Sequence, residues 1–313
     1  MADRSLREAK ILITGLTGQV AKPVALSLAK ENDVWGIARF TNPATKEELE
    51  THGITCLKVD LAEPDFRGLP QDFDYVLNFA VSYESDFDVV ISTIVEGLGL
   101  LMSHCRRAQA FLHCSTTGVY RFNGHNPLKE TDPLGDSHNV LMPPYSICKI
   151  AAEGMARYAA RQWNLPVVIA RLNVPYGNNG GWPSMHLEMI LAGEPIVVHT
   201  NKPSIYNPIH EDDIIRTIPG LLKIAAVPAT IVNWAGKDQV SIEEWSEHMG
   251  KLTGKEVRFT YTEQTFESSV ADTSRMHQLV GETRTDWRDG MRRMIESRHP
   301  ELTLKAGAQE RPT

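Results

Sequence analysis

The chain has 313 residues, a formal charge of −7 at pH 7, and ordinary shares of hydrophobic (42%) and charged (23%) residues. This length suits one large α/β domain or two linked units with a sizeable core. The acidic balance argues against a nucleic-acid partner, which would require a basic surface. The polar start MADRSLREAK lacks an apolar signal core, and we count no run of the roughly 18 apolar residues needed for a membrane span. We therefore expect a soluble, cytoplasmic protein.

The four cysteines are Cys56, Cys105, Cys114 and Cys148, and no two of them form a Cys-x-x-Cys pair. All four stand in apolar surroundings. We therefore expect reduced core thiols, with neither a disulfide framework nor a metal site.

Short β-rich runs alternate with helical patterns through the first half of the chain. The runs are KILIT, VWGIA, ITCLKV, YVLNFAV, AFLHCST and PVVIARL, and the helical patterns cover residues 20–30, 87–107 and 145–163. Such alternation is typical of a parallel sheet with helices on both faces. The sequence therefore predicts an α/β fold with a Rossmann-type, doubly wound parallel sheet.

The regularity weakens after the segment RLNVPYGNNGGWP. Helical patterns at 184–193, 212–226 and 242–252 are interleaved with the short strands ATIVNWA and EVRFTY. We expect a dinucleotide-binding domain at 1–175, to which some later segments return, and a smaller mixed substrate-binding lobe at 176–305, with a cleft between them. Residues 306–313 are expected to form a flexible tail.

The first strand runs into a glycine turn in the segment ILITGLTGQVA. Glycine permits a tight turn and lets backbone N–H groups approach a pyrophosphate, although a strand-to-helix turn also needs glycine for steric reasons alone. Its place in the first β–α unit favours dinucleotide binding. The expected contacts from this turn are Gly15, Thr17, Gly18, Gln19 and Val20.

The ends of the next strands bear on the choice of dinucleotide. After the second strand there is no acid to bind a ribose 2′-hydroxyl, and Arg39 stands there instead. An arginine suits a 2′-phosphate, so NADP(H) is favoured and NAD(H) remains possible, because Arg39 could also stack on adenine or be solvated. Further expected cofactor contacts are Asp60 and Leu61 after the third strand, where Asp60 could instead begin a turn, and Phe79 and Ala80 after the fourth.

Tyr145 precedes Lys149 by one helical turn in the segment PPYSICK. A tyrosine, with a reference pKa near 10, is a poor acid or base at neutral pH unless a nearby cation stabilises its phenolate. The lysine could supply that cation from the same helix face. The spacing alone is common by chance, so its neighbourhood must decide.

Several motifs around this pair occur in a characteristic order. They are the Gly-x-x-Gly-x-x-Ala turn, VDL, NFAV, STTGVY, YSICK, RLNVPYG, NPIHEDD and DTSRMHQLVG. Together they resemble the extended short-chain dehydrogenase/reductase superfamily, which includes the NAD-dependent epimerases and dehydratases. The resemblance covers almost the whole chain.

The resemblance implies roles for individual residues. Tyr145 would be the acid/base, and Lys149 would lower its pKa and hold the nicotinamide ribose. Thr116 would orient the substrate oxygen, and an error of one position would transfer that role to Ser115. The resemblance also implies a helix-mediated homodimer.

The chain departs from the nucleotide-sugar branch of that superfamily. Val174 replaces an expected asparagine, with Asn173 one residue early, and no basic residue lies between Ser204 and His210 to bind a diphosphate. Thr117 and Gly118 stand where dehydratases carry an Asp-Glu pair.

These departures favour an NAD(P)-dependent oxidoreductase that interconverts a secondary alcohol and a carbonyl of a small-molecule substrate. An NAD-dependent epimerase of a sugar or nucleotide sugar is the alternative. A non-catalytic dinucleotide sensor is a remote third, because Tyr145 and Lys149 are both kept.

The expected substrate contacts come from three regions, with the loop 121–142 as a lid. They are Ser82, Tyr83, Thr116, Tyr176, Trp182 and His186. Tyr176 and Trp182 could equally pack at the lobe interface. The acidic segment His210–Asp213 is expected to cap a helix rather than bind a metal.

Overall fold

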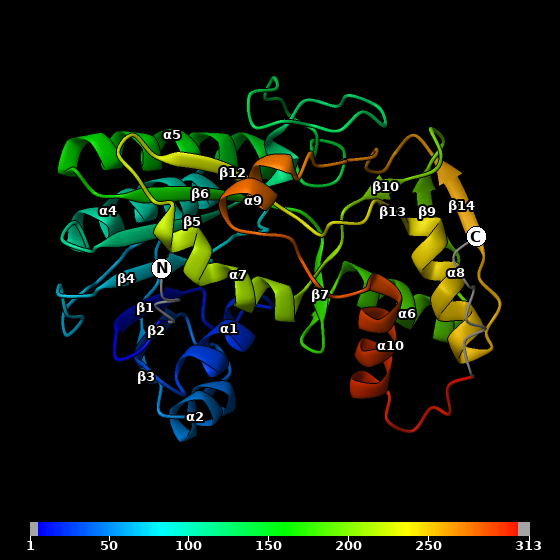
Figure 1. The fold of residues 1–313 in the computed structure, drawn as a ribbon, viewed down its shortest axis with the longest axis horizontal. Coiled ribbons are helices and arrows are strands. Elements are labelled where there is room, and N and C mark those ends of the chain that lie inside the picture. Colours follow the sequence, from blue (N-terminus) through cyan, green and yellow to red (C-terminus); the bar gives the residue numbers. More distant parts are fainter. Residues whose placement is uncertain (1–5, 306–313) are drawn as a thin grey trace.

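A seven-stranded parallel sheet forms the spine of the molecule in the computed structural model, which describes residues 6–305 (Figure 1). Its strand order is β12-β6-β5-β4-β1-β2-β3. The order reverses between β1 and β4, and open α/β sheets bind ligands at the carboxyl ends of such strands. The strands are β1 (Lys10–Thr14), β2 (Asp33–Ala38), β3 (Thr55–Lys58), β4 (Tyr75–Asn78), β5 (Ala110–Thr116), β6 (Val167–Leu172) and β12 (Thr230–Trp234). The predicted doubly wound α/β fold is confirmed.

Helices cover both faces of this sheet because successive strand residues point to opposite sides. Ile11 and Ile13 join one core, whereas Leu12 between them joins the other. The first face carries α1 (Ala21–Leu28), α2 (Pro43–Thr51), α7 (Glu211–Lys223) and α9 (Ser274–Leu279). The second face carries α3 (Phe87–Ile91), the π-helical turn η1 (Ser92–Glu96), α4 (Gly97–His104) and α5 (Tyr145–Trp163).

A smaller lobe lies beside the carboxyl ends of the strands, at the right of Figure 1. Its own core includes Leu187, Trp245 and Met291. Its helices are α6 (Trp182–Ala192), α8 (Ile242–Thr253) and α10 (Trp287–Arg298). Short strands complete it: β7 (Pro175–Gly177), β8 (Gly180–Gly181), β9 (Ile196–His199), β10 (Ile205–Tyr206), β11 (Ile209–His210), β13 (Val240–Ser241) and β14 (Phe259–Thr262).

The segment 176–305 divides between the two cores. The run ATIVNWA becomes β12, which pairs in parallel with β6 at the edge of the large sheet. Ile214 and Ile218 of α7 and Met276 of α9 also pack into a core of that sheet. These are later segments that return to the first domain, and the predicted tail 306–313 lies outside the described residues.

One helical run in the described part of the chain, Phe87–His104, is long and apolar enough to cross a membrane by length and composition. This finding corrects our count from the sequence, which found no such run. A core helix meets the same criterion, and here Leu98, Leu101 and Met102 pack between the sheet and α5. The run therefore contributes to the core of the first domain.

Candidate active site

A cavity of about 640 Å³ opens where the carboxyl ends of the strands face the lobe. Its wall combines the turn after β1, the ends of β4 and β5, the start of α5, the loop before α5, and lobe residues near Trp182 and Phe266. Ligand sites are commonly cavities of this size that lie between a domain and its neighbour. This cavity is the candidate active site.

The turn after β1 forms the floor of the cavity. Gly15 has a φ of +65°, and a Cβ there would lie 3.0 Å from the backbone N and Cα of Ala80. Glycine is therefore required both by the left-handed backbone and by the close approach of β4. Gly18, Gln19 and Val20 also line the cavity, and the Gln19 Nε2 donates to the carbonyl oxygen of Pro175 at 2.9 Å.

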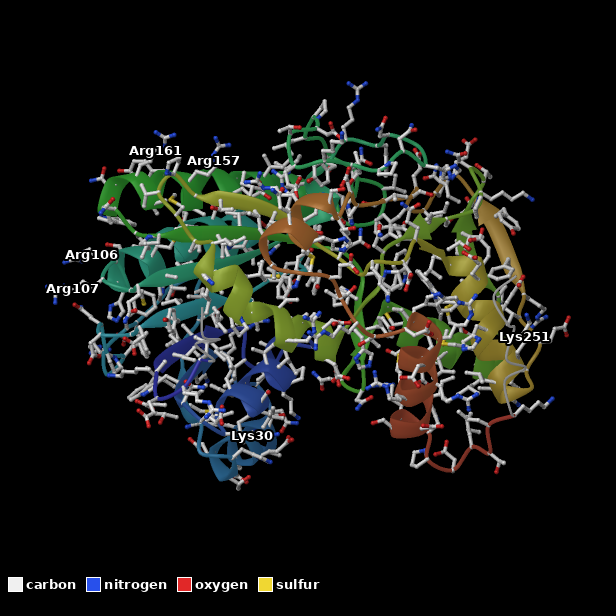
Figure 2. All side chains as sticks on the ribbon, in the orientation of Figure 1. Lys30, Arg106, Arg107, Arg157, Arg161 and Lys251 are labelled. Carbon is white, nitrogen blue, oxygen red and sulfur yellow. The ribbon has the colours of Figure 1, made fainter. Side chains whose placement is uncertain are left out.

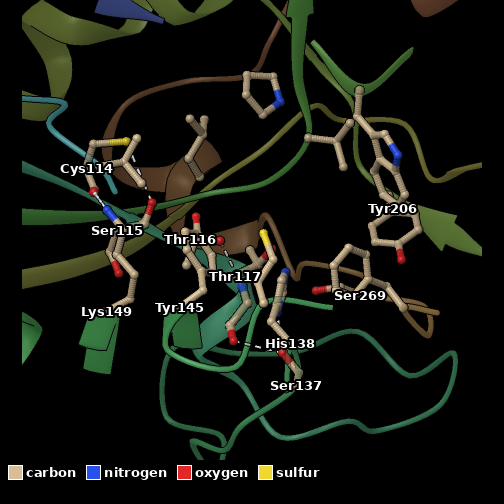
Figure 3. A pocket seen from close by; sticks show the side chains of 18 of the residues that line it. Cys114, Ser115, Thr116, Thr117, Ser137, His138, Tyr145, Lys149, Tyr206 and Ser269 are labelled. Carbon is tan, nitrogen blue, oxygen red and sulfur yellow. Dashed lines mark hydrogen bonds between the residues drawn. The ribbon is translucent and has the colours of Figure 1, made fainter. Parts of the chain in front are cut away.

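Tyr145 and Lys149 project into the cavity from the first turns of α5 (Figure 3). Lys149 is buried, and its Nζ donates to the carbonyl oxygen of Cys114 at 3.1 Å. The Tyr145 ring lies between Tyr83, whose ring centroid is 5.9 Å away, and His138, at 5.2 Å. The helix spacing therefore brings both predicted groups to one wall of one cavity.

The pKa of the Tyr145 phenol is raised, chiefly by burial, while the neighbouring Thr116 hydroxyl lowers it. Burial lowers the pKa of Lys149, and its ammonium is directed at the Cys114 carbonyl. The expected lowering of the phenol pKa by Lys149 is thus not seen in this structure, because desolvation of the phenolate outweighs the other effects.

The two neighbouring hydroxyls of β5 have different surroundings. Ser115 Oγ donates to Glu153 Oε1 at 2.6 Å, and Glu153 forms a buried, two-pronged pair with Arg171 at 2.9 and 2.7 Å. Thr116 lies beside the Tyr145 phenol. Of the two, Thr116 is therefore the hydroxyl available to a substrate, while Ser115 ties β5 to α5.

Aromatic side chains form the opposite wall. The ring of Trp182 lies 5.1 Å from Tyr206 and 6.0 Å from Phe266, both in edge-on contacts. Tyr83 stands at the rim with 70% of its surface exposed. Trp182, Tyr206 and Phe266 therefore give this wall an aromatic surface.

Asn173 and Val174 explain one departure from the nucleotide-sugar pattern. The Asn173 Nδ2 donates to Thr117 Oγ1 at 2.9 Å and to the Ser269 carbonyl at 2.8 Å, and its Oδ1 accepts from the Asn207 backbone at 3.0 Å. Asn173 is therefore a structural cross-link, and the side chain presented to the cavity at this point is the apolar Val174.

Three predicted substrate contacts lie outside the cavity wall. The His186 Nδ1 accepts from the indole of Trp245 at 3.0 Å, and the Tyr176 hydroxyl donates to the Trp287 carbonyl at 3.4 Å. Ser82 is buried, and its Oγ accepts from the Glu84 backbone at 3.4 Å. The alternative of interface packing is the correct one for Tyr176, whereas Trp182 lines the cavity.

The predicted cofactor contacts divide in the same way. Phe79 lines the cavity with the glycine turn. Arg39 and Thr17 are exposed outside the cavity. The Asp60 carboxylate accepts from the Ala62 N–H at 3.0 Å and so stabilises a local turn, and Leu61 packs against Gly97. Ala80 lies behind Gly15, where its N–H donates to Thr14 Oγ1 at 3.2 Å. These five residues do not line the cavity.

Several lining residues were not singled out from the sequence. They are Arg121, Phe122, His138, Met142, Phe266 and Ser269. Four of them lie in the loop 121–142, and the expectation that this loop forms a lid was the only indication from the sequence that they line the cavity. Phe266 and Ser269 come from a segment more than 100 residues away from α5. No short spacing could have identified them.

Positive charge is sparse in the cavity. Among the described residues, Arg121 and Lys149 are the lysines and arginines that line it. Figure 2 labels Arg106, Arg107, Arg157 and Arg161, which are exposed at the end of the sheet away from the lobe. Those surface arginines do not reach the cavity.

The acidic segment before α7 serves the fold. His210 Nδ1 accepts from the Asp212 N–H at 3.1 Å, and the two Asp213 oxygens accept from the N–H groups of Arg284 and Thr285 at 2.8 Å each. Within residues 6–305, no group of three or more His, Cys, Asp or Glu side chains is placed to bind a metal. The His210 imidazole therefore caps α7, and Asp213 ties the start of the helix to residues 284 and 285.

The cavity also fits a nicotinamide dinucleotide. The glycine turn offers backbone N–H groups at the start of α1. Lys149 is only 3% exposed and has one hydrogen bond for three ammonium donors, so two donors can serve a bound polar group. Gly15, Gly18, Gln19, Val20, Tyr145 and Lys149 are the residues that would hold the dinucleotide.

The chain is similar to known proteins in sequence. Residues 11–233 match the model of the NAD dependent epimerase/dehydratase family. UDP-glucuronate 4-epimerase 1 of Arabidopsis thaliana is 27% identical over 239 residues, which are 68% of this chain and 54% of that protein. The chain thus spans about half the length of this curated relative.

Solved structures share the fold at low sequence identity. UDP-glucuronic acid 4-epimerase from Bacillus cereus, in complex with UDP-glucuronic acid and NAD, has a TM-score of 0.79 at 22% identity and covers 92% of this chain and 98% of its own. UDP-glucose 4-epimerase from Thermotoga maritima has a TM-score of 0.80 at 18% identity, with 93% and 99% covered. The dTDP-glucose 4,6-dehydratase DesIV from Streptomyces venezuelae has a TM-score of 0.78 at 19% identity, with 93% and 97% covered.

The family match extends from β1 to β12 and so includes every strand of the large sheet and the Tyr145–Lys149 pair. It confirms the resemblance drawn from the order of the motifs. The chain belongs to the NAD-dependent epimerase/dehydratase family.

Proposed function

We propose that the protein is an NAD-dependent epimerase that inverts a secondary carbinol of a sugar or nucleotide sugar. The observation that carries the proposal is the convergence of Tyr145, Thr116 and Lys149 on one cavity whose floor is the glycine turn. The epimerase names of the curated relative and of two structural neighbours support it. This replaces the simple oxidoreductase as the leading interpretation.

The residues of the chain divide the proton work between them. The Thr116 hydroxyl donates to the substrate oxygen and holds it beside the Tyr145 phenol. As a phenolate, Tyr145 receives the hydroxyl proton when the carbinol becomes a ketone and returns it when the carbinol re-forms. The Lys149 ammonium and the positive charge of bound NAD would stabilise that phenolate and offset the burial that otherwise raises the phenol pKa. Bound NAD would accept the hydride of that carbon and give it back. An inverted centre results when the ketone presents its other face before the hydride returns.

NAD is the cofactor we propose, in place of the NADP favoured by Arg39 alone. Arg39 is exposed outside the cavity, and the Bacillus cereus neighbour is in complex with NAD. Titration of the purified protein with NADH and NADPH, followed by fluorescence, tests this choice. Tighter binding of NADPH would restore the original preference.

Net oxidoreduction of an apolar alcohol or ketone is the second candidate. Phe122, Met142, Val174 and Phe266 line the substrate side, and Arg121 is the lysine or arginine, besides Lys149, that lines the cavity among the described residues. An apolar substrate would bury its surface against these side chains without losing charge-assisted hydrogen bonds.

One incubation separates the two candidates. The full-length protein is loaded with NAD and mixed with UDP-glucuronate, UDP-glucose or an apolar secondary alcohol, and products are resolved by proton NMR while NADH is followed by absorbance. Epimerisation gives a new sugar isomer with no net NADH. Stoichiometric NADH with an apolar alcohol, and no sugar isomer, would establish the second candidate instead.

We further propose that the enzyme is a cytoplasmic homodimer. Leu100 of α4 and Ile147 of α5 expose 52% and 45% of their surfaces on neighbouring helices, which supports an apolar contact between two copies. Light scattering after size exclusion tests the dimer, and a monomeric mass at micromolar concentration would contradict it. Fractionation of the source cells tests the compartment.

A further inference from the structure

His138 stands beside the proposed acid/base although it comes from the loop before α5 rather than from the helix. Its ring centroid lies 5.2 Å from that of Tyr145 and 4.6 Å from that of Phe266. A Cβ at position 118 would collide with the imidazole Cε1, so the glycine at that position makes room for the ring. Figure 3 shows His138 on the same side of the cavity as Tyr145.

The hydrogen bonds of Ser137 determine which imidazole nitrogen carries the proton. Ser137 Oγ lies 2.8 Å from the Gly118 carbonyl oxygen, which can only accept, so the serine donates its single proton there. The His138 Nδ1 lies 3.0 Å from the same Oγ and must therefore donate to it. Nδ1 carries the proton, and Nε2 is left with a free lone pair.

The Nε2 lone pair is available to a ligand. Among residues 6–305 no protein group donates to it, and His138 is part of the cavity wall. Burial lowers the pKa of His138 to about 4, so the ring stays neutral near pH 7 and remains an acceptor. A neutral acceptor that has no protein donor needs a donor from the substrate.

We propose that His138 Nε2 accepts a hydrogen bond from a second hydroxyl of the substrate, carried by a carbon next to the one that reacts. The substrate class is therefore a vicinal diol, as in a sugar ring. One hydroxyl meets Tyr145 and Thr116, and its neighbour meets His138. This inference rests on the proposed function for the identity of the reacting carbon.

The geometry favours a neighbouring hydroxyl over the reacting one. The Tyr145 and His138 ring centroids are 5.2 Å apart, so a substrate that places one hydroxyl at the Tyr145 phenol has a neighbouring hydroxyl within reach of the His138 ring. Of the residues beside His138, Phe266 and Met142 offer no hydroxyl, amide or charge, and the Ser137 hydroxyl already contacts the Gly118 carbonyl and His138 itself. Ser269 and Tyr206 also line the cavity, and His138 is the acceptor that we assign to the second hydroxyl.

The test compares substrates with and without the second hydroxyl. Wild type and His138→Phe, both full-length and saturated with NAD, are assayed with UDP-glucose and its 3-deoxy analogue, and with butane-2,3-diol and butan-2-ol. Phenylalanine keeps the stacking on Tyr145 and Phe266 but cannot accept. Wild type should have a kcat/KM about tenfold higher for the member of each pair that carries the second hydroxyl, because one neutral hydrogen bond contributes a factor of about this size. His138→Phe should lose that preference.

Two further variants separate the hydrogen bond from packing. His138→Gln keeps an acceptor and should recover part of the preference. Gly118→Ala forces the ring aside and should weaken the preference as His138→Phe does. The inference is overturned if His138→Phe prefers the substrate with the second hydroxyl as strongly as wild type does. It is also overturned if His138→Phe loses the same fraction of kcat/KM with the diol as with the substrate that lacks the second hydroxyl.

The outcomes for the two proposals can be told apart. No turnover of UDP-sugars, with a His138-dependent preference for the simple diol, rejects the proposed function and supports the inference. Epimerisation with a preference that ignores His138 does the reverse. The nitrogen-15 chemical shifts of His138 give a reading without any substrate: a proton on Nε2 in the free protein would overturn the inference, and a proton on Nδ1 supports it.

Discussion

The two sides of the cavity are built in different ways. The cofactor side comes from short contiguous segments, namely the turn after β1 and the start of α5, fixed on the rigid sheet. The substrate side is assembled from Phe122, Trp182, Tyr206 and Phe266, which four separate segments supply. Chemistry is thus placed by secondary structure, whereas substrate choice depends on how the loop and lobe pack.

The largest expected effect removes the acid/base from the rigid side. Tyr145→Phe keeps the ring and its stacking but cannot carry the proton, so turnover should fall by about 10²- to 10⁴-fold. Initial rates under saturating NAD measure this fall. The affinity for NADH should change little by comparison.

Tyr158→Phe is the matched control, because Tyr158 lies on the same helix with 57% of its surface exposed. It should retain full activity. Equal rates in wild type and Tyr145→Phe would remove Tyr145 from the mechanism.

The rigid side also depends on the buried Glu153–Arg171 pair, whose side chains are 4% and 3% exposed. Glu153→Gln leaves the Arg171 charge buried without a counter-ion and should lower the free energy of unfolding by about 3–5 kcal/mol. Urea unfolding measures the loss. Glu50→Gln, which opens the exposed pair with Lys46 on α2, should cost less than about 1 kcal/mol. Similar losses for the two variants would show that the buried pair has no special role.

A pH-dependent loss of stability should come from His113, under the cofactor side. Burial, aided by the nearby Lys149 charge, lowers the pKa of His113 to about 3. Between the ordinary value of about 6.5 and that pKa, only the unfolded chain binds the proton, so stability falls as pH decreases, by up to about 1.4 kcal/mol per pH unit. His113→Asn should unfold with a shallower acid dependence in urea titrations at successive pH values.

His299 supplies a control of opposite sign. Burial lowers the pKa of His299, but hydrogen bonds that its ring donates to the Glu188 and Glu301 carboxylates raise that pKa overall. A raised pKa adds stability that is fully present below the ordinary value of about 6.5 and is lost as pH rises through the folded-state pKa, so His299→Asn should remove a loss of stability above about pH 6.5 and leave the acid slope unchanged. An unchanged acid slope in His113→Asn would contradict the assignment of a neutral buried imidazole.

The same contrast explains how far the sequence alone could lead. Tyr145, Lys149 and the glycine turn follow from period and spacing, and the long helix of α5 matches its predicted bounds. From the sequence, Tyr176, His186 and Trp182 are equivalent, because each is an aromatic residue near the start of the lobe. In the structure, Tyr176 and His186 point into the core of the lobe, whereas Trp182 lines the cavity. Which aromatic faces the cavity is decided by tertiary partners such as Trp245 and Trp287, and no local pattern encodes that choice.

The smallest predicted effect lies on the substrate side and tests the contrast most directly. Phe266 contacts His138 and Trp182 across the cavity wall. Phe266→Ala removes aromatic contacts worth about 0.5–1.5 kcal/mol each and should raise KM about 3- to 10-fold, while kcat and NADH affinity stay within about twofold. Phe87→Ala, on the exposed surface of α3, is the control and should change none of these values. An equal weakening of NADH binding and of substrate binding by Phe266→Ala would contradict the separation of the two sides. In that case the side chain of Phe266 would position the glycine turn through its contact with Trp182 and through the hydrogen bond between Gln19 and Pro175.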